Sequence, residues 1–132
     1  MGMYILVALG GALGTTGRYL LSGVAARLIG ETFPWGTLVI NVTGSFIIGF
    51  FAALTGPDGR LYVGSAGRQF FMTGICGGYT TFSSFSLQTL NLMNDGEWFR
   101  ASANIGLSVA LCLIAVWAGA LLAGTINAMK WT

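Results

Sequence analysis

The chain has 132 residues, of which 55% are hydrophobic and only 8% are charged. Soluble domains carry roughly 25% charged residues, so this composition predicts an integral membrane protein. The net charge of +2 is too small to indicate nucleic acid as a partner, and the absence of histidine excludes imidazole chemistry and most zinc sites. The sequence shows no nucleophile–base pair and no cluster of metal ligands, so we do not expect an enzyme.

The six basic and four acidic residues leave four charge-free segments, at 1–17, 32–57, 69–94 and 101–129. A membrane-spanning helix needs about 20 apolar residues. The last three segments are long enough alone, and the first is long enough if it continues through Arg18. We therefore expect four transmembrane helices, at about 3–29, 35–55, 67–93 and 98–127. Short connections join them, so residues 1–132 are predicted to form a single four-helix transmembrane domain.

The basic residues outside the expected spans are almost balanced between the two sides of the membrane. One side holds the N-terminus, Arg60, Arg68 and Lys130, and the other holds Arg27 and Arg100. Lys and Arg near the ends of the spans set membrane orientation. A balanced count gives no firm orientation, and we hypothesise that the chain inserts both ways and assembles as an antiparallel pair.

The first expected helix carries a close-packing motif and an arginine. Gly10 and Gly14 have the GxxxG spacing that lets helices cross closely. Arg18 would be costly if it faced lipid, and no acidic residue lies in any expected span. Two interpretations stay open for Arg18: it caps carbonyl groups near an interface, or it lines an aqueous vestibule and attracts anions.

The third expected helix contains the unusual segment TGICGGYTTFSSFS at 73–86. In lipid every backbone polar group needs a partner, so a break rich in glycine and hydroxyl groups is tolerated only beside protein, water or an ion. Gly77 and Gly78 can unwind a helix. Unwinding there would release carbonyl groups around 76–80, which are hard oxygen ligands suited to an alkali or alkaline-earth cation.

Beyond this break, aromatic and polar side chains share the helix surface. Phe82 and Phe85 lie on one face, and an adjoining stripe is formed by Thr81, Ser84 and Gln88. The edges of aromatic rings carry partial positive charge, so these phenylalanines are able to face an anion.

Two further polar stripes follow helical spacing in the second and fourth expected helices. They consist of Thr37, Asn41 and Ser45, and of Asn104, Ser108 and Cys112. Taken alone, Asn41 is either an interhelical hydrogen-bonding group or an amide that donates to a passing anion, and both interpretations stay open. Together with the stripe of the third helix, the two sets indicate a lined path.

The strings GGALGTTGRY, NVTGSF and GGYTTFSSFS, in this order, resemble the Fluc (CrcB) fluoride channel family over essentially the whole chain. The resemblance implies an all-α integral membrane fold with four transmembrane helices per subunit and a broken third helix. It also implies an antiparallel (dual-topology) homodimer with two pores. The implied function is passive export of cytoplasmic fluoride through a multi-pass channel in the plasma (inner) membrane.

The resemblance also implies roles for individual residues. Backbone carbonyls of Gly77 and Thr80 from both subunits would hold a structural sodium ion. Arg18 would lie in a vestibule. The fluoride path would be lined by Asn41, Thr81, Phe82, Ser84, Phe85, Gln88 and Ser108. Members of the family often carry glutamate shortly after the second phenylalanine, where this chain has Gln88.

Two other functions are compatible with the length and the number of expected helices. A non-transporting membrane assembly subunit would explain the glycines but leaves the three polar stripes without purpose. A small multidrug-type exporter needs a carboxylate inside the membrane, and the acidic residues Glu31, Asp58, Asp95 and Glu97 all lie outside the expected spans.

Overall fold

In the computed structural model, which describes residues 1–129, the chain is all-helical, so the all-α prediction is confirmed for this part. The elements are α1 (Gly2–Ile29), α2 (Trp35–Leu54), α3 (Ser65–Arg68), the π-helical η1 (Gln69–Cys76), α4 (Gly77–Tyr79), α5 (Phe82–Asn94) and α6 (Trp98–Ala128). Helices α1, α2 and α6 are long and apolar enough to cross a membrane. Their bounds differ by at most one residue from the expected spans. Lys130, which entered the orientation count, lies outside the described residues.

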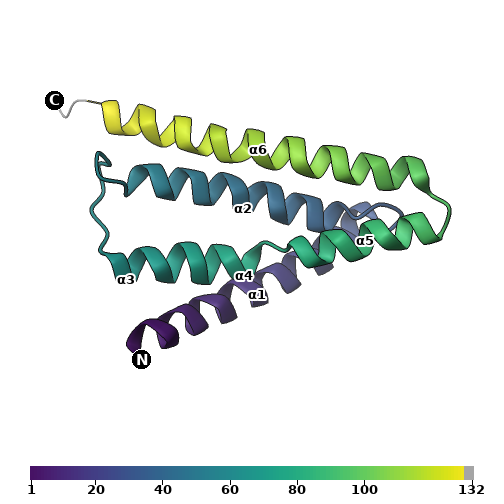
Figure 1. Cartoon of the computed structure of the whole chain (residues 1–132), viewed down its shortest axis with the longest axis horizontal. Helices are drawn as coiled ribbons and strands as arrows, with labels where there is room; N and C mark the ends of the chain where they lie inside the picture. Colours follow the sequence, from purple (N-terminus) through teal and green to yellow (C-terminus); the bar gives the residue numbers. More distant parts are fainter. Residues whose placement is uncertain (130–132) are drawn as a thin grey trace.

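The segment expected to be the third span is divided. Elements α3, η1 and α4 follow one another without interruption, and α5 continues beyond a short non-helical stretch (Figure 1). That stretch is Thr80 and Thr81, whose backbones are extended, with φ −84° and ψ 158° at Thr80 and φ −152° and ψ 114° at Thr81.

The expectation that Gly77 and Gly78 unwind the helix is wrong. Gly77 has helical angles, φ −64° and ψ −36°, and Gly78 lies within α4. Gly78 allows α1 to approach the divided helix closely, since a Cβ there would lie 2.6 Å from the carbonyl oxygen of Gly11 and 3.1 Å from Thr15 Oγ1. The absence of a side chain therefore lets α1 contact α4, and the helix ends one residue later, at Tyr79.

Helices α2 and α6 lie side by side along most of their length (Figure 1). Small residues make this contact close. A Cβ on Gly49 would collide with the carbonyl oxygen of Val116, and one on Gly119 with that of Phe46. Lipid tails are as apolar as leucine, so van der Waals contact of this kind drives helix association in membranes.

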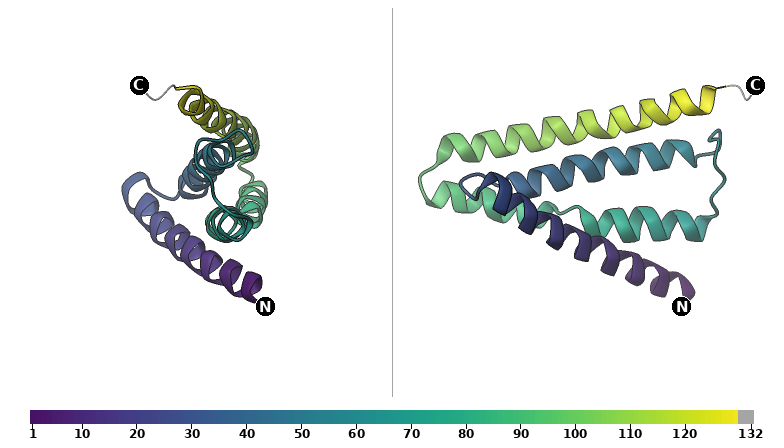
Figure 2. Two further views of the ribbon diagram at one scale, coloured as in Figure 1. Left: turned by 90° about the vertical axis from the view of Figure 1, so that its left-hand side faces the viewer. Right: turned by 180° about the vertical axis from the view of Figure 1, so that it is seen from behind.

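Helix α1 runs obliquely across η1 and α4 and diverges from α6 (Figure 2). Its GxxxG residues lie at the crossing: a Cβ on Gly10 would be 2.5 Å from the Phe70 carbonyl oxygen, and one on Gly14 would be 2.8 Å from the Tyr79 nitrogen. The α1 motif thus holds the first half of the divided helix.

Candidate functional site

The amide of Asn41 on α2 is paired with the backbone of Thr81. Its Nδ2 donates to the Thr81 carbonyl oxygen at 3.0 Å, and its Oδ1 accepts from the Thr81 N–H at 2.8 Å. One side chain therefore satisfies both backbone groups of a residue that belongs to no helix. An unpaired backbone group in lipid costs several kcal/mol, so this pairing makes the extended stretch tolerable.

The rest of the NVTG segment of α2 also contacts this stretch. The hydroxyls of Thr43 and Tyr79 are hydrogen-bonded at 2.8 Å. A Cβ on Gly44 would collide with Thr80 Cγ2 and lie 3.0 Å from the Tyr79 ring. Asn41 and Thr43 thus bind the residues around the break by hydrogen bonds, and Gly44 leaves the space that these residues need.

Helix α1 contributes donors from the opposite side. Arg18 Nε donates to the Gly78 carbonyl oxygen at 3.1 Å, and Thr15 Oγ1 donates to the same oxygen at 3.4 Å. Arg18 thus caps a carbonyl group of the divided helix, and its expected place in a vestibule stays a prediction.

Two carbonyl oxygens near the break stay uncommitted. In a continuous helix the Gly77 oxygen would accept from the N–H of Thr81, but that N–H is bonded to Asn41. Within residues 1–129, the structure shows no hydrogen bond to the carbonyl oxygens of Gly77 or Thr80. The Thr80 hydroxyl is turned back to the carbonyl of Cys76 at 3.0 Å. Backbone oxygens, and not this hydroxyl, are therefore the groups available to a ligand.

A cavity of about 390 Å³, the central groove, lies where α2, α5 and α6 meet the break. Its lining is mostly apolar, with Ile48, Val109 and Leu113 beside the rings of Phe82 and Phe85. Polar groups are set into this lining, from Asn41, Ser45, Gly77, Thr80, Thr81 and Ser108. The two rings have centroids 5.3 Å apart and planes inclined by 51°. Phe85 is buried, with 9% of its surface exposed, whereas Phe82 is 77% exposed.

Behind the groove runs a buried chain of hydrogen bonds. Ser108 Oγ contacts Asn104 Oδ1 at 3.3 Å, and Asn104 Nδ2 contacts Thr89 Oγ1 at 2.9 Å. Thr89 Oγ1 then bonds the carbonyl oxygen of Phe85 at 2.8 Å. Helix α6 is thereby joined to α5 by buried hydrogen bonds between side chains.

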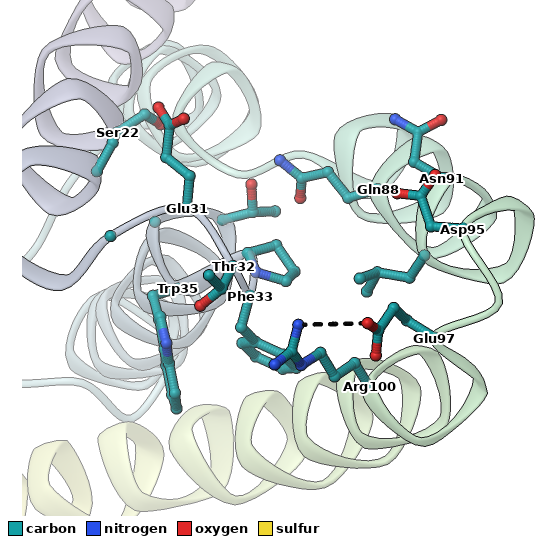
Figure 3. Close-up of a pocket in the computed structure, with 16 residues that line it drawn as sticks. Ser22, Glu31, Thr32, Phe33, Trp35, Gln88, Asn91, Asp95, Glu97 and Arg100 are labelled. Carbon is teal, nitrogen blue, oxygen red and sulfur yellow. Dashed lines mark ion pairs between the residues drawn. The ribbon is translucent and has the colours of Figure 1, made fainter.

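A second cavity of about 550 Å³, the mouth cavity, opens between the α1–α2 loop and the α5–α6 turn (Figure 3). Its charged lining residues are Glu31, Asp95, Glu97 and Arg100. Glu97 and Arg100 form an ion pair at 3.7 Å. Gln88 reaches into this cavity from α5, and its buried Oε1 has no hydrogen-bond partner.

A family model described as "CrcB-like protein, Camphor Resistance (CrcB)" matches residues 5–120. The chain belongs to this family. Two proteins that are similar to this CrcB-like chain are named "Fluoride-specific ion channel FluC". The protein from Opitutus terrae is 62% identical over 130 residues, which cover 98% of both chains. The protein from Methylocella silvestris is 57% identical over 127 residues, covering 96% of this chain and 97% of the relative.

The structure brings most, but not all, of the predicted site residues of this CrcB-like chain together. Five of the seven predicted path residues line the central groove: Asn41, Thr81, Phe82, Phe85 and Ser108. Gly77 and Thr80 lie at the same groove. Gln88 lines the mouth cavity instead, while Ser84 and Arg18 line neither of these two cavities.

Several residues that shape the site of this CrcB-like protein gave no signal of their own in the sequence. Thr89 bonds back to the preceding turn, as Ser and Thr often do in membrane helices, and nothing in its spacing indicates a contact with Asn104. Tyr79 resembles any apolar residue of a membrane span. The NVTG string is visible as a motif, but its contacts with the break depend on how α2 is placed in three dimensions.

Proposed function

We propose that this chain is a fluoride-selective passive ion channel that exports cytoplasmic fluoride across the plasma membrane. The observation that carries the proposal is the 62% identity, over 98% of both chains, to a protein named as a fluoride-specific ion channel. The groove adds support from chemistry, since it places hydrogen-bond donors and aromatic edges in an otherwise apolar environment.

Fluoride is small and strongly hydrated, so a pore must replace its water with donors. An asparagine amide carries two N–H groups, and Asn41 gives one to Thr81, which leaves the second for the groove. The hydroxyl of Ser108 and the positive edges of Phe82 and Phe85 complete the set. An inside-negative potential assists the exit of an anion by about 2.3 kcal/mol per 100 mV.

The proposed working unit is an antiparallel homodimer. In a single chain Phe82 is 77% exposed although it lines the groove, and a second copy would cover it. The near balance of basic residues on the two sides of the spans is compatible with insertion in both orientations.

The proposed dimer also holds a structural sodium ion. The uncommitted carbonyl oxygens of Gly77 and Thr80 are hard ligands of the type that alkali cations use. Each chain supplies these two oxygens, so two chains together would supply enough for an ion shared at their interface. The Gly78 oxygen is already occupied by Arg18 and Thr15 and is not proposed as a ligand.

Reconstitution in liposomes tests the main proposal. Liposomes loaded with potassium fluoride are diluted into fluoride-free medium above pH 7, where little hydrogen fluoride exists to leak out. The potassium carrier valinomycin is then added, and an external electrode records fluoride. A passive channel releases fluoride only once valinomycin lets potassium follow, and chloride loaded in parallel stays inside. Release no faster than from protein-free liposomes would refute the channel and favour the assembly subunit.

A further inference from the structure

The hydrogen-bond chain behind the central groove has a fixed direction. It runs from Ser108 through Asn104 and Thr89 to the Phe85 carbonyl oxygen. Two oxygens only 2.8 Å apart share a proton, and a carbonyl has none to give. The Thr89 hydroxyl must therefore donate to Phe85, and its oxygen is left to accept.

This direction determines how the Asn104 amide is turned. Because Thr89 Oγ1 can only accept, Asn104 presents its NH₂ group to Thr89 and its Oδ1 to Ser108. The Ser108 hydroxyl then donates to Asn104. Only 2% of Asn104, 6% of Thr89 and 7% of Ser108 are exposed, so bulk water does not compete for these groups.

The consequence appears at the groove wall. With its proton directed at Asn104, Ser108 presents oxygen lone pairs to the groove, which is unfavourable for an anion. The bond from Ser108 to Asn104 is also the longest of the chain, at 3.3 Å, against 2.9 Å and 2.8 Å for the others. It is therefore the bond that gives way when a stronger acceptor arrives.

We propose that Asn104 is a positioning residue, because it holds the Ser108 hydroxyl turned away from the groove. When fluoride binds, the Ser108 hydroxyl turns and donates its hydrogen bond to fluoride in place of Asn104. Asn104 does not line the groove, so it acts only through Ser108. This inference rests on the proposed function, because it concerns the binding of the same anion.

The sharpest test is Thr89→Val, which keeps the shape of the side chain and removes its hydroxyl. Without an acceptor at position 89, the Asn104 amide is free to turn its NH₂ toward Ser108, and the Ser108 proton then faces the groove. We expect the fluoride concentration for half-maximal flux to fall roughly five-fold, the worth of one neutral hydrogen bond. Asn104→Leu, which removes the acceptor of the Ser108 proton, should act in the same direction.

Two controls separate this effect from a general change in structure. Thr125→Val on α6 removes a hydroxyl that likewise bonds to its own helix, at Leu121, far along the chain from the groove, and should leave the half-maximal concentration unchanged. Thr89→Ser restores the hydroxyl and should restore the wild-type value. In a Ser108→Ala background, Thr89→Val should have no effect on the half-maximal concentration.

Three results would overturn the inference while wild-type conduction stands. The first is a shift by Thr89→Val that persists in the Ser108→Ala background. The others are an unchanged half-maximal fluoride concentration, or weaker fluoride binding, in both Thr89→Val and Asn104→Leu. Absence of fluoride flux in the wild type would instead refute the proposed function. If the variants do not fold, a measurement on the wild-type protein still tests the inference. In asparagine-labelled protein, the ¹³C resonance of the Asn104 side-chain carbonyl should move as fluoride is added, because the oxygen loses a donor. A resonance that does not respond would also overturn the inference.

Discussion

Asn41 and Thr81 are joined by two hydrogen bonds of opposite direction, at the one place in the divided helix where the backbone is extended. The side-chain amide replaces a neighbouring peptide group, so α2 supplies the hydrogen bonds that the Thr81 backbone does not form within a helix. The break is consequently a property of two helices, and its stability depends on a residue 40 positions away in the sequence.

Replacing Asn41 by alanine should lower both stability and fluoride flux. Two backbone groups of Thr81 would lose their partners, and we expect a loss of about 2 kcal/mol or more in the free energy of unfolding. Thermal unfolding in detergent and flux in liposomes would measure the two effects.

Asn127 offers a matched control for this change. It also bonds in both directions, accepting from the Arg60 N–H at 2.8 Å and donating to the Ala53 carbonyl at 3.0 Å, but away from the groove. Asn127→Ala should lower stability while flux per folded protein is retained. Equal loss of flux in both variants would mean that Asn41 has no special part in conduction.

Gly14→Ala should separate α1 from the divided helix. A Cβ at this position would collide with the carbonyl oxygen of Ile75 and lie 2.8 Å from the Tyr79 nitrogen. Overpacking of this kind costs roughly 1–3 kcal/mol. Gly17→Ala is the control, because nothing lies within 4 Å of its added Cβ. If the two variants unfold at the same temperature, the close crossing of α1 is not important for stability.

The helix bounds could be predicted from the sequence because charged residues, Pro34 and turn glycines lie between the apolar segments. Gly30 and Gly96 both have positive φ, 101° and 77°, at the ends of α1 and α5. The position of the break could not be predicted in the same way. Gly77 and Gly78 are able to unwind a helix, but whether they do depends on whether another backbone approaches them, and α1 does approach Gly78.

The predicted site was only partly predictable for a similar reason. Helical spacing puts Asn41, Phe85 and Ser108 on polar or aromatic faces of their helices, and in the structure all three line the central groove. Spacing alone cannot say how far along its helix each residue lies relative to another helix. Gln88, one turn beyond Phe85, therefore belongs to the mouth cavity and not to the groove.

Phe82→Ile should reduce fluoride flux with little effect on the stability of the single chain. The ring is 77% exposed, so little packing is lost, while the isoleucine has no positive ring edge to face an anion. Phe99→Ile, at a residue that is 86% exposed near the start of α6, is the control and should conduct normally. Unchanged flux in Phe82→Ile would exclude the aromatic edge as a fluoride ligand.

Removing negative charge from the mouth cavity should speed fluoride entry. The cavity holds the carboxylates of Glu31, Asp95 and Glu97, with Arg100 as the basic residue of its lining. Asp95→Asn should raise flux at low fluoride and low ionic strength by about two-fold, because a repulsive field slows the capture of an anion. At 1 M salt, where the Debye length is about 3 Å, the difference should disappear.

Asp58→Asn is the control for this electrostatic effect. It is the same chemical change in the loop between α2 and α3, outside the residues that line the mouth cavity. An equal increase in flux from both variants, or an increase that persists at high salt, would show that the mouth cavity does not govern entry.

The last prediction concerns the proposed sodium ion and uses Thr80→Val. The Thr80 hydroxyl is bonded to the Cys76 carbonyl within its own turn, whereas the Thr80 carbonyl is uncommitted. Valine removes the hydroxyl and keeps the carbonyl and the branched shape that contacts Gly44. A ligand that binds only the folded state raises the unfolding temperature, so the upward shift on replacing N-methyl-glucamine by sodium should be the same in Thr80→Val and wild type. Loss of the shift in this variant, with the shift retained in Thr125→Val, would assign the ligand to the side chain. A wild type that does not respond to sodium would remove the ion from the proposal and leave fluoride conduction to be judged by the flux measurement alone.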